Sequence, residues 1–304
     1  MRLGEPKLTA VSLSSTLLLG FLAGVTILLG LPVGRLRKPA PSLRLLLNAA
    51  AVGVLLFLVW DVLSAAWEPI DVALGSFHEG DGGLASAIGY GALFVGGLAV
   101  GLVSLVFYES WMARQVRATP AGAPRHEGPG AMSLGEVSPP RGIASWSAAR
   151  RLSLLIAVGI GLHNFAEGLA IGQSAASGEI GLAVMLVIGF GLHNATEGFG
   201  IVAPLAADVD HDGTTRRPSW GFLLALGAIG GGPTFIGTLI GHGFTNEPVS
   251  VAFLTLAAGS LIYVITQLIG VAARSKRSDL LAYGLLLGLV AGFLTDAIVT
   301  AAGV

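Results

Sequence analysis

GLHNFAEG, residues 161–168, and GLHNATEG, residues 191–198, repeat one pattern, each copy inside a long apolar run. On an α-helix, which turns about 100° per residue, the Glu of each copy projects about 40° round from its His. The Asn projects about 100° round, so each carboxylate lies between an imidazole and an amide. Ionisable side chains near the centre of a bilayer cost roughly 3 kcal/mol each, so two such helices need a compensating partner. A divalent cation is the simplest one, because a role in helix contact alone leaves two identical polar faces unexplained.

The repeat nominates six metal ligands: His163, Asn164 and Glu167 in the first copy, and His193, Asn194 and Glu197 in the second. Two imidazoles and two carboxylates match the four-coordinate preference of Zn²⁺, and the Asn oxygens suit Fe²⁺ or Mn²⁺. The chain has no cysteine, which excludes a thiolate site and a disulfide framework. Two carboxylates neutralise a dication and leave no net charge in the membrane. This charge match favours transport of a divalent metal, one high-affinity ion at a time.

The composition is that of a polytopic membrane protein. Apolar residues make up 53% of the 304 and charged residues only 12%, against about 25% in soluble domains. Eight apolar stretches are long enough to span about 30 Å of hydrocarbon, which predicts an all-α membrane protein. The predicted spans cover about 8–32, 45–66, 86–108, 152–172, 181–206, 220–242, 248–272 and 279–301. The repeat falls in the fourth and fifth spans, whose short connection makes them antiparallel and predicts inverted-repeat symmetry with a metal site between them at the midplane.

Basic residues predict the orientation. All 17 Lys and Arg residues except Arg2 and Lys7 fall in alternate loops, after the first, third, fifth and seventh spans. The positive-inside rule places these loops in the cytoplasm, so we expect a multi-pass protein of the cell membrane with both termini outside. A Pro-, Gly- and Ser-rich loop divides the chain into residues 1–116 with three spans, a flexible cytoplasmic segment 117–148, and residues 149–304 with five spans and the metal site.

Features outside the repeat carry expectations of their own. The sixth span contains GGGP at residues 230–233, which predicts a kink or local unwinding near the substrate. Residues 67–85 are expected to form an acidic outer loop. Asp61 and Asp296 are expected at one depth near the outer surface, where they either face each other on a cation path or merely end their helices. The first span has no ionisable residue and is assigned no chemistry.

The loop after the fifth span contains DVDHDG at residues 208–213, which starts like a calcium-binding loop. Its twelfth position is Ser219 instead of the bidentate Glu, so calcium sensing is rejected. The weaker expectation is that Asp208 to Asp212 form a cation-receiving cluster at the cytoplasmic mouth.

The paired HNxxEG helices, the eight-span plan with outside termini and the variable loop after the third span resemble the ZIP family of divalent-metal transporters. The resemblance implies that the six residues of the repeat coordinate the transported metal, Zn²⁺ first and otherwise Fe²⁺, Mn²⁺ or Cd²⁺, on its way into the cytoplasm. It implies no cofactor, no enzyme activity and no nucleic-acid partner; the partners are the metal ion and the lipid bilayer, with a homodimer left open. The chain departs from many members at Ala166, Thr196, Gly232 and Gln267, where relatives carry a Pro or an acid.

Two other functions remain open at the level of the sequence. An intramembrane metallohydrolase also needs buried His and carboxylate ligands, but its HExxH signature is absent from the sequence. A proton-coupled carrier would use the same His and Glu side chains as a relay. Metal uptake into proteoliposomes, compared with hydrolysis of lipid and peptide substrates, separates these functions.

Overall fold

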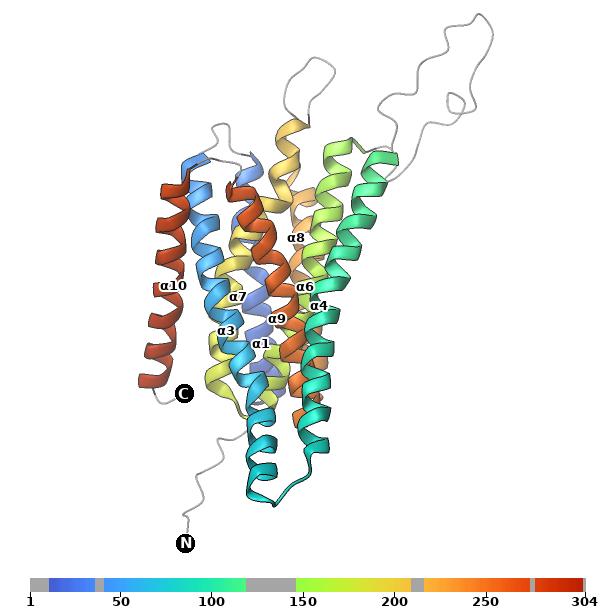
Figure 1. Cartoon of the computed structure of the whole chain (residues 1–304). Helices are drawn as coiled ribbons and strands as arrows, with labels where there is room; N and C mark the ends of the chain where they lie inside the picture. Colours follow the sequence, from blue (N-terminus) through green and yellow to red (C-terminus); the bar gives the residue numbers. More distant parts are fainter. Residues whose placement is uncertain (1–10, 36–40, 119–145, 209–215, 274–276, 303–304) are drawn as a thin grey trace, which may run out of the picture.

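The computed structural model describes residues 11–35, 41–118, 146–208, 216–273 and 277–302. Within these ranges, eight helical spans are long and apolar enough to cross a membrane, which confirms the predicted number. They run side by side along one axis (Figure 1). The helical segments are α1 (Leu13–Val25), α2 (Ile27–Gly30), η1 (Leu31–Arg35), α3 (Pro41–Glu79), α4 (Leu84–Ala118), α6 (Ala148–Ser177), α7 (Ile180–Val202), η3 (Ala203–Ala207), α8 (Trp220–Gly241), α9 (Glu247–Ala273) and α10 (Ser278–Ala301).

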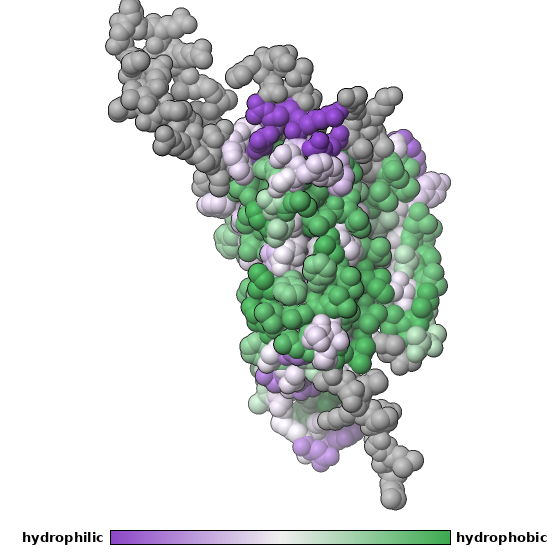
Figure 2. Space-filling view, turned by 180° about the vertical axis from the view of Figure 1, so that it is seen from behind, coloured by the Kyte–Doolittle hydropathy of each residue, from purple (hydrophilic) through white to green (hydrophobic). Residues whose placement is uncertain are grey.

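The surface carries an apolar belt around the middle of the molecule, with hydrophilic residues at the two ends of the face in Figure 2. Large apolar side chains on α10 illustrate the belt, since Leu286, Val290 and Phe293 are all more than half exposed. Such a surface is stable only against hydrocarbon, because soluble proteins rarely expose continuous apolar patches of this extent. The chain is therefore an all-α, multi-pass membrane protein.

The two helices that carry the repeat form a tight antiparallel hairpin. Ser147 caps the start of α6 by accepting a hydrogen bond from the N–H of Arg150. Gly178 ends α6 in the left-handed region, with φ at 86°, and its N–H returns to the carbonyl of Ala175. Because α7 begins at Ile180, only two residues separate the helices. The two copies of the motif are thus brought face to face with opposite chain directions.

The second span is longer than the sequence indicated. We expected it to end near residue 66 and an acidic loop to follow, but α3 continues to Glu79 and turns at Gly80, whose φ is 81°. The apolar residues between Pro69 and Phe77 sustain the helix beyond the predicted boundary. At about 1.5 Å per residue, the 35-residue span Leu45–Glu79 is roughly 50 Å long. The hairpin of α3 and α4 therefore extends past a hydrocarbon layer of about 30 Å at the lower end of Figure 1.

The interrupted span is the first one, and this corrects a second expectation. Pro233 lies inside α8, yet α8 is assigned as helix without a break from Trp220 to Gly241, so local unwinding there is wrong. The first span instead stops being α-helical at Thr26, resumes as one turn of α2 and ends as the 3₁₀-helix η1. The hydroxyl of Thr26 donates to the carbonyl of Ala23 at 2.7 Å, a side-chain bond that often bends helices.

The helices pack as two bundles that alternate along the chain. One, the motif bundle, contains α1, α2, α6, α7 and α8, with α6 lying along α8 for most of its length. The second bundle contains α3, α4, α9 and α10. The motif-closing glycines hold the first bundle close: a Cβ at Gly168 would lie 2.1 Å from the carbonyl oxygen of Thr234 on α8, and one at Gly198 would lie 2.5 Å from that of Ile27 on α2. Contacts between the bundles run mainly from α6 to α9 and from α7 to α3.

Candidate metal site

All six residues nominated by the repeat are buried in the motif bundle, on α6 and α7. Their exposed fractions do not exceed 6%. The residues concerned are His163, Asn164 and Glu167 on α6, and His193, Asn194 and Glu197 on α7. Buried side chains of this kind require partners, because transfer of an unpaired charge into an apolar medium is prohibitively costly.

The imidazoles and carboxylates contact each other crosswise between the two helices. Nε2 of His163 lies 2.7 Å from Oε1 of Glu197, a hydrogen-bond distance. Nε2 of His193 lies 3.3 Å from Oε1 of Glu167 and 3.5 Å from Oε1 of Glu197. The two imidazole rings are stacked, with centroids 6.2 Å apart and planes inclined by 24°. Each copy of the motif thus supplies a histidine to the carboxylate of the other copy.

Several of these buried atoms have no hydrogen-bond partner. Both carboxylate oxygens of Glu167, both ring nitrogens of His193 and Oε2 of Glu197 are unsatisfied. The 3.3 Å contact between His193 and Glu167 is close but not aligned as a hydrogen bond. One ligand atom each from His163, Glu167 and His193 lies within 4.8 Å of the others. Imidazole nitrogens and carboxylate oxygens that lie close together without hydrogen-bond partners fit a divalent transition metal, which would bind all of them at once.

The two asparagines are held by backbone carbonyls of neighbouring helices. Nδ2 of Asn164 donates to the carbonyl oxygen of Gly230 on α8 at 2.9 Å, and Nδ2 of Asn194 donates to that of Ala23 on α1 at 3.1 Å. In both side chains Oδ1 is buried and unpartnered. The amide nitrogens therefore fix the side-chain orientation and leave an oxygen free as a ligand. These hydrogen bonds follow the inverted repeat too, because α8 holds the asparagine of α6 and α1 holds the equivalent asparagine of α7.

A cavity of about 460 Å³ adjoins the site. It touches His163 and Glu197 of the nominated residues and then runs between the two bundles along α3, α4 and α9. Its remaining polar lining comprises Asn48, Tyr108, Glu109, Thr196, Tyr263 and Gln267. These side chains belong to the helix halves that lead into the basic loops. Glu167 and His193 do not line this cavity, so it opens only one side of the site.

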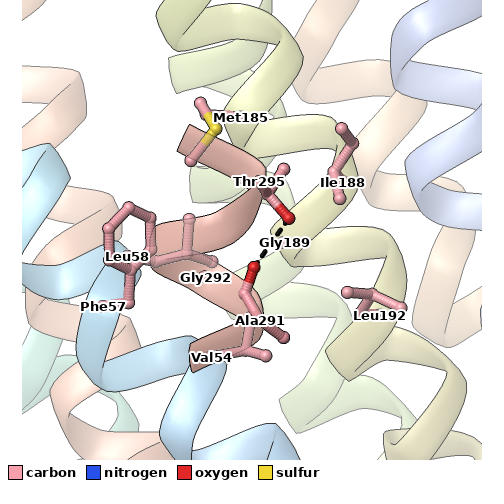
Figure 3. Close-up of a pocket in the computed structure, with 10 residues that line it drawn as sticks. All are labelled: Val54, Phe57, Leu58, Met185, Ile188, Gly189, Leu192, Ala291, Gly292 and Thr295. Atoms are coloured by element: carbon pink, nitrogen blue, oxygen red, sulfur yellow. Dashed lines mark hydrogen bonds between the residues drawn. The ribbon is translucent and has the colours of Figure 1, made fainter. Parts of the chain in front are cut away.

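A second, small cavity carries no chemistry. It holds about 10 Å³, room for roughly one water, between α3, α7 and α10. Figure 3 shows apolar side chains such as Phe57, Met185 and Leu192 around it. The one hydroxyl in view, that of Thr295, already donates to the carbonyl of Ala291 at 2.8 Å. None of the six nominated residues lines this cavity.

The two outer aspartates do come together. On the parallel helices α3 and α10, Gly53 packs on Gly288 and Phe57 on Gly292, so the next step of four residues pairs Asp61 with Asp296. The two carboxylates interact electrostatically, and Oδ2 of Asp61 is buried without a partner. This favours the first of the two readings, a carboxylate pair rather than two unrelated helix ends.

The proposed cytoplasmic acidic cluster fares differently. Asp208 is 2% exposed, and its Oδ2 accepts a hydrogen bond from Nε of Arg150 at 2.9 Å. Its carboxylate is thus committed to an ion pair that ties the end of η3 to the start of α6. Asp210, His211 and Asp212 lie outside the described residues.

Sequence reasoning missed two contributors to the site and its surroundings. The carbonyl of Ala23 belongs to a span that was assigned no chemistry. Glu109, which directly follows the predicted span 86–108, was given no role; its Oε2 accepts hydrogen bonds from Tyr263 and from Gln267 in the wall of the large cavity. A backbone acceptor such as the carbonyl of Ala23 cannot be recognised in a sequence. An acid at the end of a predicted span, as Glu109 is, can be recognised and was a usable signal.

The fold and the buried residues define a polytopic helical membrane protein with a cluster of His and Glu side chains suited to a metal ion. The sequence profile of the family described as ZIP Zinc transporter matches residues 125–299, more than half of the chain. The chain therefore belongs to the ZIP family, whose members transport divalent metals. A search of curated proteins found no match.

Proposed function

We propose that the protein carries Zn²⁺ into the cytoplasm through the site between α6 and α7, with Fe²⁺, Mn²⁺ and Cd²⁺ as competing substrates. The observation that carries this proposal is a buried cluster in which ligand atoms of His163, Glu167 and His193 lie within 4.8 Å of one another. Glu197 contacts both histidines, and both oxygens of Glu167, both ring nitrogens of His193 and Oε2 of Glu197 have no hydrogen-bond partner. Imidazole and carboxylate together suit Zn²⁺, whereas Mg²⁺ and Ca²⁺ prefer oxygen ligands only. Asn164 and Asn194 add one buried, unpartnered amide oxygen each.

The charges of the site support one tightly bound ion. Two carboxylates neutralise one dication, while a second dication would leave two excess positive charges in a region of low dielectric constant. Both asparagine amide groups are neutral and already use their nitrogens in helix contacts. The asparagine side of the site is therefore occupied weakly or by water.

The large cavity supports a conformation that is open to the cytoplasm. It lies among the halves of α3, α4, α6, α7 and α9 that lead into the basic loops, and the positive-inside rule assigns these loops to the cytoplasm. The orientation, with both chain ends outside the cell membrane, is part of the proposal. Transport then requires a second conformation, in which Glu167 and His193 become accessible from the outside.

The distribution of ligands indicates which part moves. All six candidate ligands lie in the motif bundle, and the asparagine anchors on α1 and α8 lie there too. The large cavity, by contrast, is bounded by both bundles. Displacement of the motif bundle against the second bundle changes access without breaking the coordination sphere. We expect this motion to be the transport step.

Uptake by purified protein in proteoliposomes tests the proposal. Zn²⁺ supplied on the side of the chain ends should enter vesicles that contain a zinc-sensitive dye. The Glu197→Gln variant should not support uptake, whereas Glu247→Gln, which changes a carboxylate at the outer end of α9, should. Uptake by Glu197→Gln at the wild-type rate would refute the site; hydrolysis of lipid or peptide substrates without uptake would favour a metallohydrolase.

A further inference from the structure

We propose that Glu109, in the inner wall of the large cavity, is a second divalent-cation position, of lower affinity, that receives the metal as it leaves the site between α6 and α7. This inference rests on the proposed function. It assigns a role to a carboxylate on α4, in the second bundle, outside the repeat and outside the part of the chain that the family profile matches.

The cavity connects the two positions directly. His163 and Glu197 line one part of it, and Glu109, Tyr263 and Gln267 line another. Two of the residues that line the cavity carry carboxylates, Glu197 and Glu109, and most of the others are apolar. A volume of about 460 Å³ accommodates a partly hydrated ion together with water. A cation that leaves Glu197 therefore meets one further negative charge within this cavity.

The side chain of Glu109 is held in place by α9. Its Oε2 accepts a hydrogen bond from the hydroxyl of Tyr263 at 2.9 Å and another from Nε2 of Gln267 at 2.9 Å. Within the described residues, Oε1 of Glu109 has no hydrogen-bond partner, and neither has Oε1 of Gln267. One carboxylate oxygen of Glu109 and the amide oxygen of Gln267 are thus available as ligands.

The donor types predict weaker binding than at the first site. The available ligands are oxygens only, and one carboxylate leaves a dication with one unneutralised positive charge. Zn²⁺ gains less from oxygen ligands than from imidazole, and retained water completes such a coordination sphere. The ion therefore passes from a tight site containing two histidines to a loose one at the inner end, which favours release over storage.

A second Tyr–Glu hydrogen bond at the other end of α4 and α9 provides a control for a purely structural role of Glu109. The hydroxyl of Tyr90 on α4 donates to Oε2 of Glu247 on α9 at 2.6 Å. This contact joins the same two helices through the same chemistry, with donor and acceptor exchanged between them. Neither Tyr90 nor Glu247 lines the large cavity. If Glu109 only ties α4 to α9, loss of either carboxylate should have the same effect.

Zinc uptake by Glu109→Gln and Glu247→Gln decides between the two roles. Glutamine retains the shape and an acceptor for the tyrosine, so only the charge is removed. We expect the maximal uptake rate of Glu109→Gln to fall roughly fivefold because release slows, with Zn²⁺ affinity of the first site unchanged in a chelator competition. Glu247→Gln should transport at the wild-type rate, and Glu109→Asp, which keeps the charge, should recover most of the loss. Equal rates for the two Gln variants, or no recovery by Asp, would overturn the proposal.

Binding of Mn²⁺, followed by electron paramagnetic resonance of the full chain in detergent, provides a direct readout. The Glu167→Gln/Glu197→Gln chain should retain one weak Mn²⁺ position, and addition of Glu109→Gln should remove it. If the double variant does not fold, the same count is made with Glu109→Gln alone, which should bind one Mn²⁺ fewer than wild type. An unchanged count would overturn the proposal while leaving the first site intact; failure of the proposed function would instead appear as normal uptake by Glu197→Gln.

Discussion

The two copies of the motif have the same His, Asn and Glu, yet the fold gives them different surroundings. His163 is hydrogen-bonded to Glu197 and both line the large cavity, whereas His193 and Glu167 are fully buried and unsatisfied. The different surroundings divide each copy internally: each copy supplies one residue to the cavity side of the site and one to the closed side. The difference therefore reflects depth in the membrane rather than sequence.

Antiparallel helices explain this division. On α6, His163 precedes Glu167, and on the antiparallel helix α7, His193 precedes Glu197. His163 therefore lies level with Glu197, and Glu167 lies level with His193. In the proposed orientation, His163 and Glu197 form the inner pair, and His193 and Glu167 form the outer pair. If the bundle moves, the inverted symmetry lets the outer pair take the open role. An inverted repeat of one motif thus yields a site that can be open to one side of the membrane or to the other, as alternating access requires.

The largest effect should come from removing a carboxylate of either pair. We expect Glu167→Gln and Glu197→Gln each to reduce zinc uptake roughly 100-fold, because one member of a buried charge cluster costs about 3 kcal/mol or more to remove. Uptake into proteoliposomes and monodispersity in detergent are the measurements. Equal loss in both would support two pairs that act in turn. Normal uptake by Glu167→Gln alone would show that only the open pair matters.

Cysteines placed at equivalent positions of the two motif helices should react with a thiol reagent at rates that differ roughly tenfold, because thiol reactivity follows exposure. Ala203 lines the cavity, and Gln173, thirty positions earlier and thus equivalent to it in the repeat, is 2% exposed and bonded to Ser177 and Ser250. The native chain has no cysteine, so single-cysteine variants report cleanly. An impermeant maleimide should label Ala203→Cys from the cytoplasmic side and Gln173→Cys slowly, from outside only. Labelling of both from one side would contradict the alternating model.

An intermediate effect is expected at the asparagines. Asn164→Asp places a carboxylate oxygen against the carbonyl of Gly230, and such a lost or repulsive contact costs about 1–3 kcal/mol, or roughly tenfold in zinc affinity. Asn194→Asp should be milder, because the carbonyl of Ala23 keeps its bond from Thr26. Chelator competition and thermal melting measure both variants. Tighter zinc binding by either Asp variant would mean that the asparagines serve only as ligands.

The smallest effect should come from Asp61 and Asp296, which in the proposed orientation lie between the outer surface and the metal site. Asp61→Asn or Asp296→Asn should lower uptake about threefold at low zinc and low ionic strength, because a carboxylate pair raises the local cation concentration. Saturating zinc or added salt should abolish the difference, since both screen or bypass attraction. A defect that persists at saturating zinc would place the pair in the transport step itself.

Much of the fold follows from the sequence, for clear physical reasons. Hydropathy predicts eight spans because each must exclude charge over about 30 Å of hydrocarbon. The helical period places His, Asn and Glu on one face, and the short connection at Gly178 makes the two faces meet. The end of α3 was misplaced because hydropathy averages over a window and cannot tell a helix that leaves the membrane from a loop. The same limitation hid the interruption at Thr26.

The sequence by itself determined which residues are costly to bury, and hence the six candidate ligands, because intramembrane charge is conspicuous wherever it occurs. Only the tertiary structure decided which of them are open to the cavity, since access depends on depth and on the neighbouring bundle. It alone paired Asn194 with Ala23, which is 171 positions away, and Tyr263 with Glu109, which is 154 positions away. Hydrogen bonds between distant helices depend on how the helices pack in three dimensions, and no local periodicity encodes that arrangement.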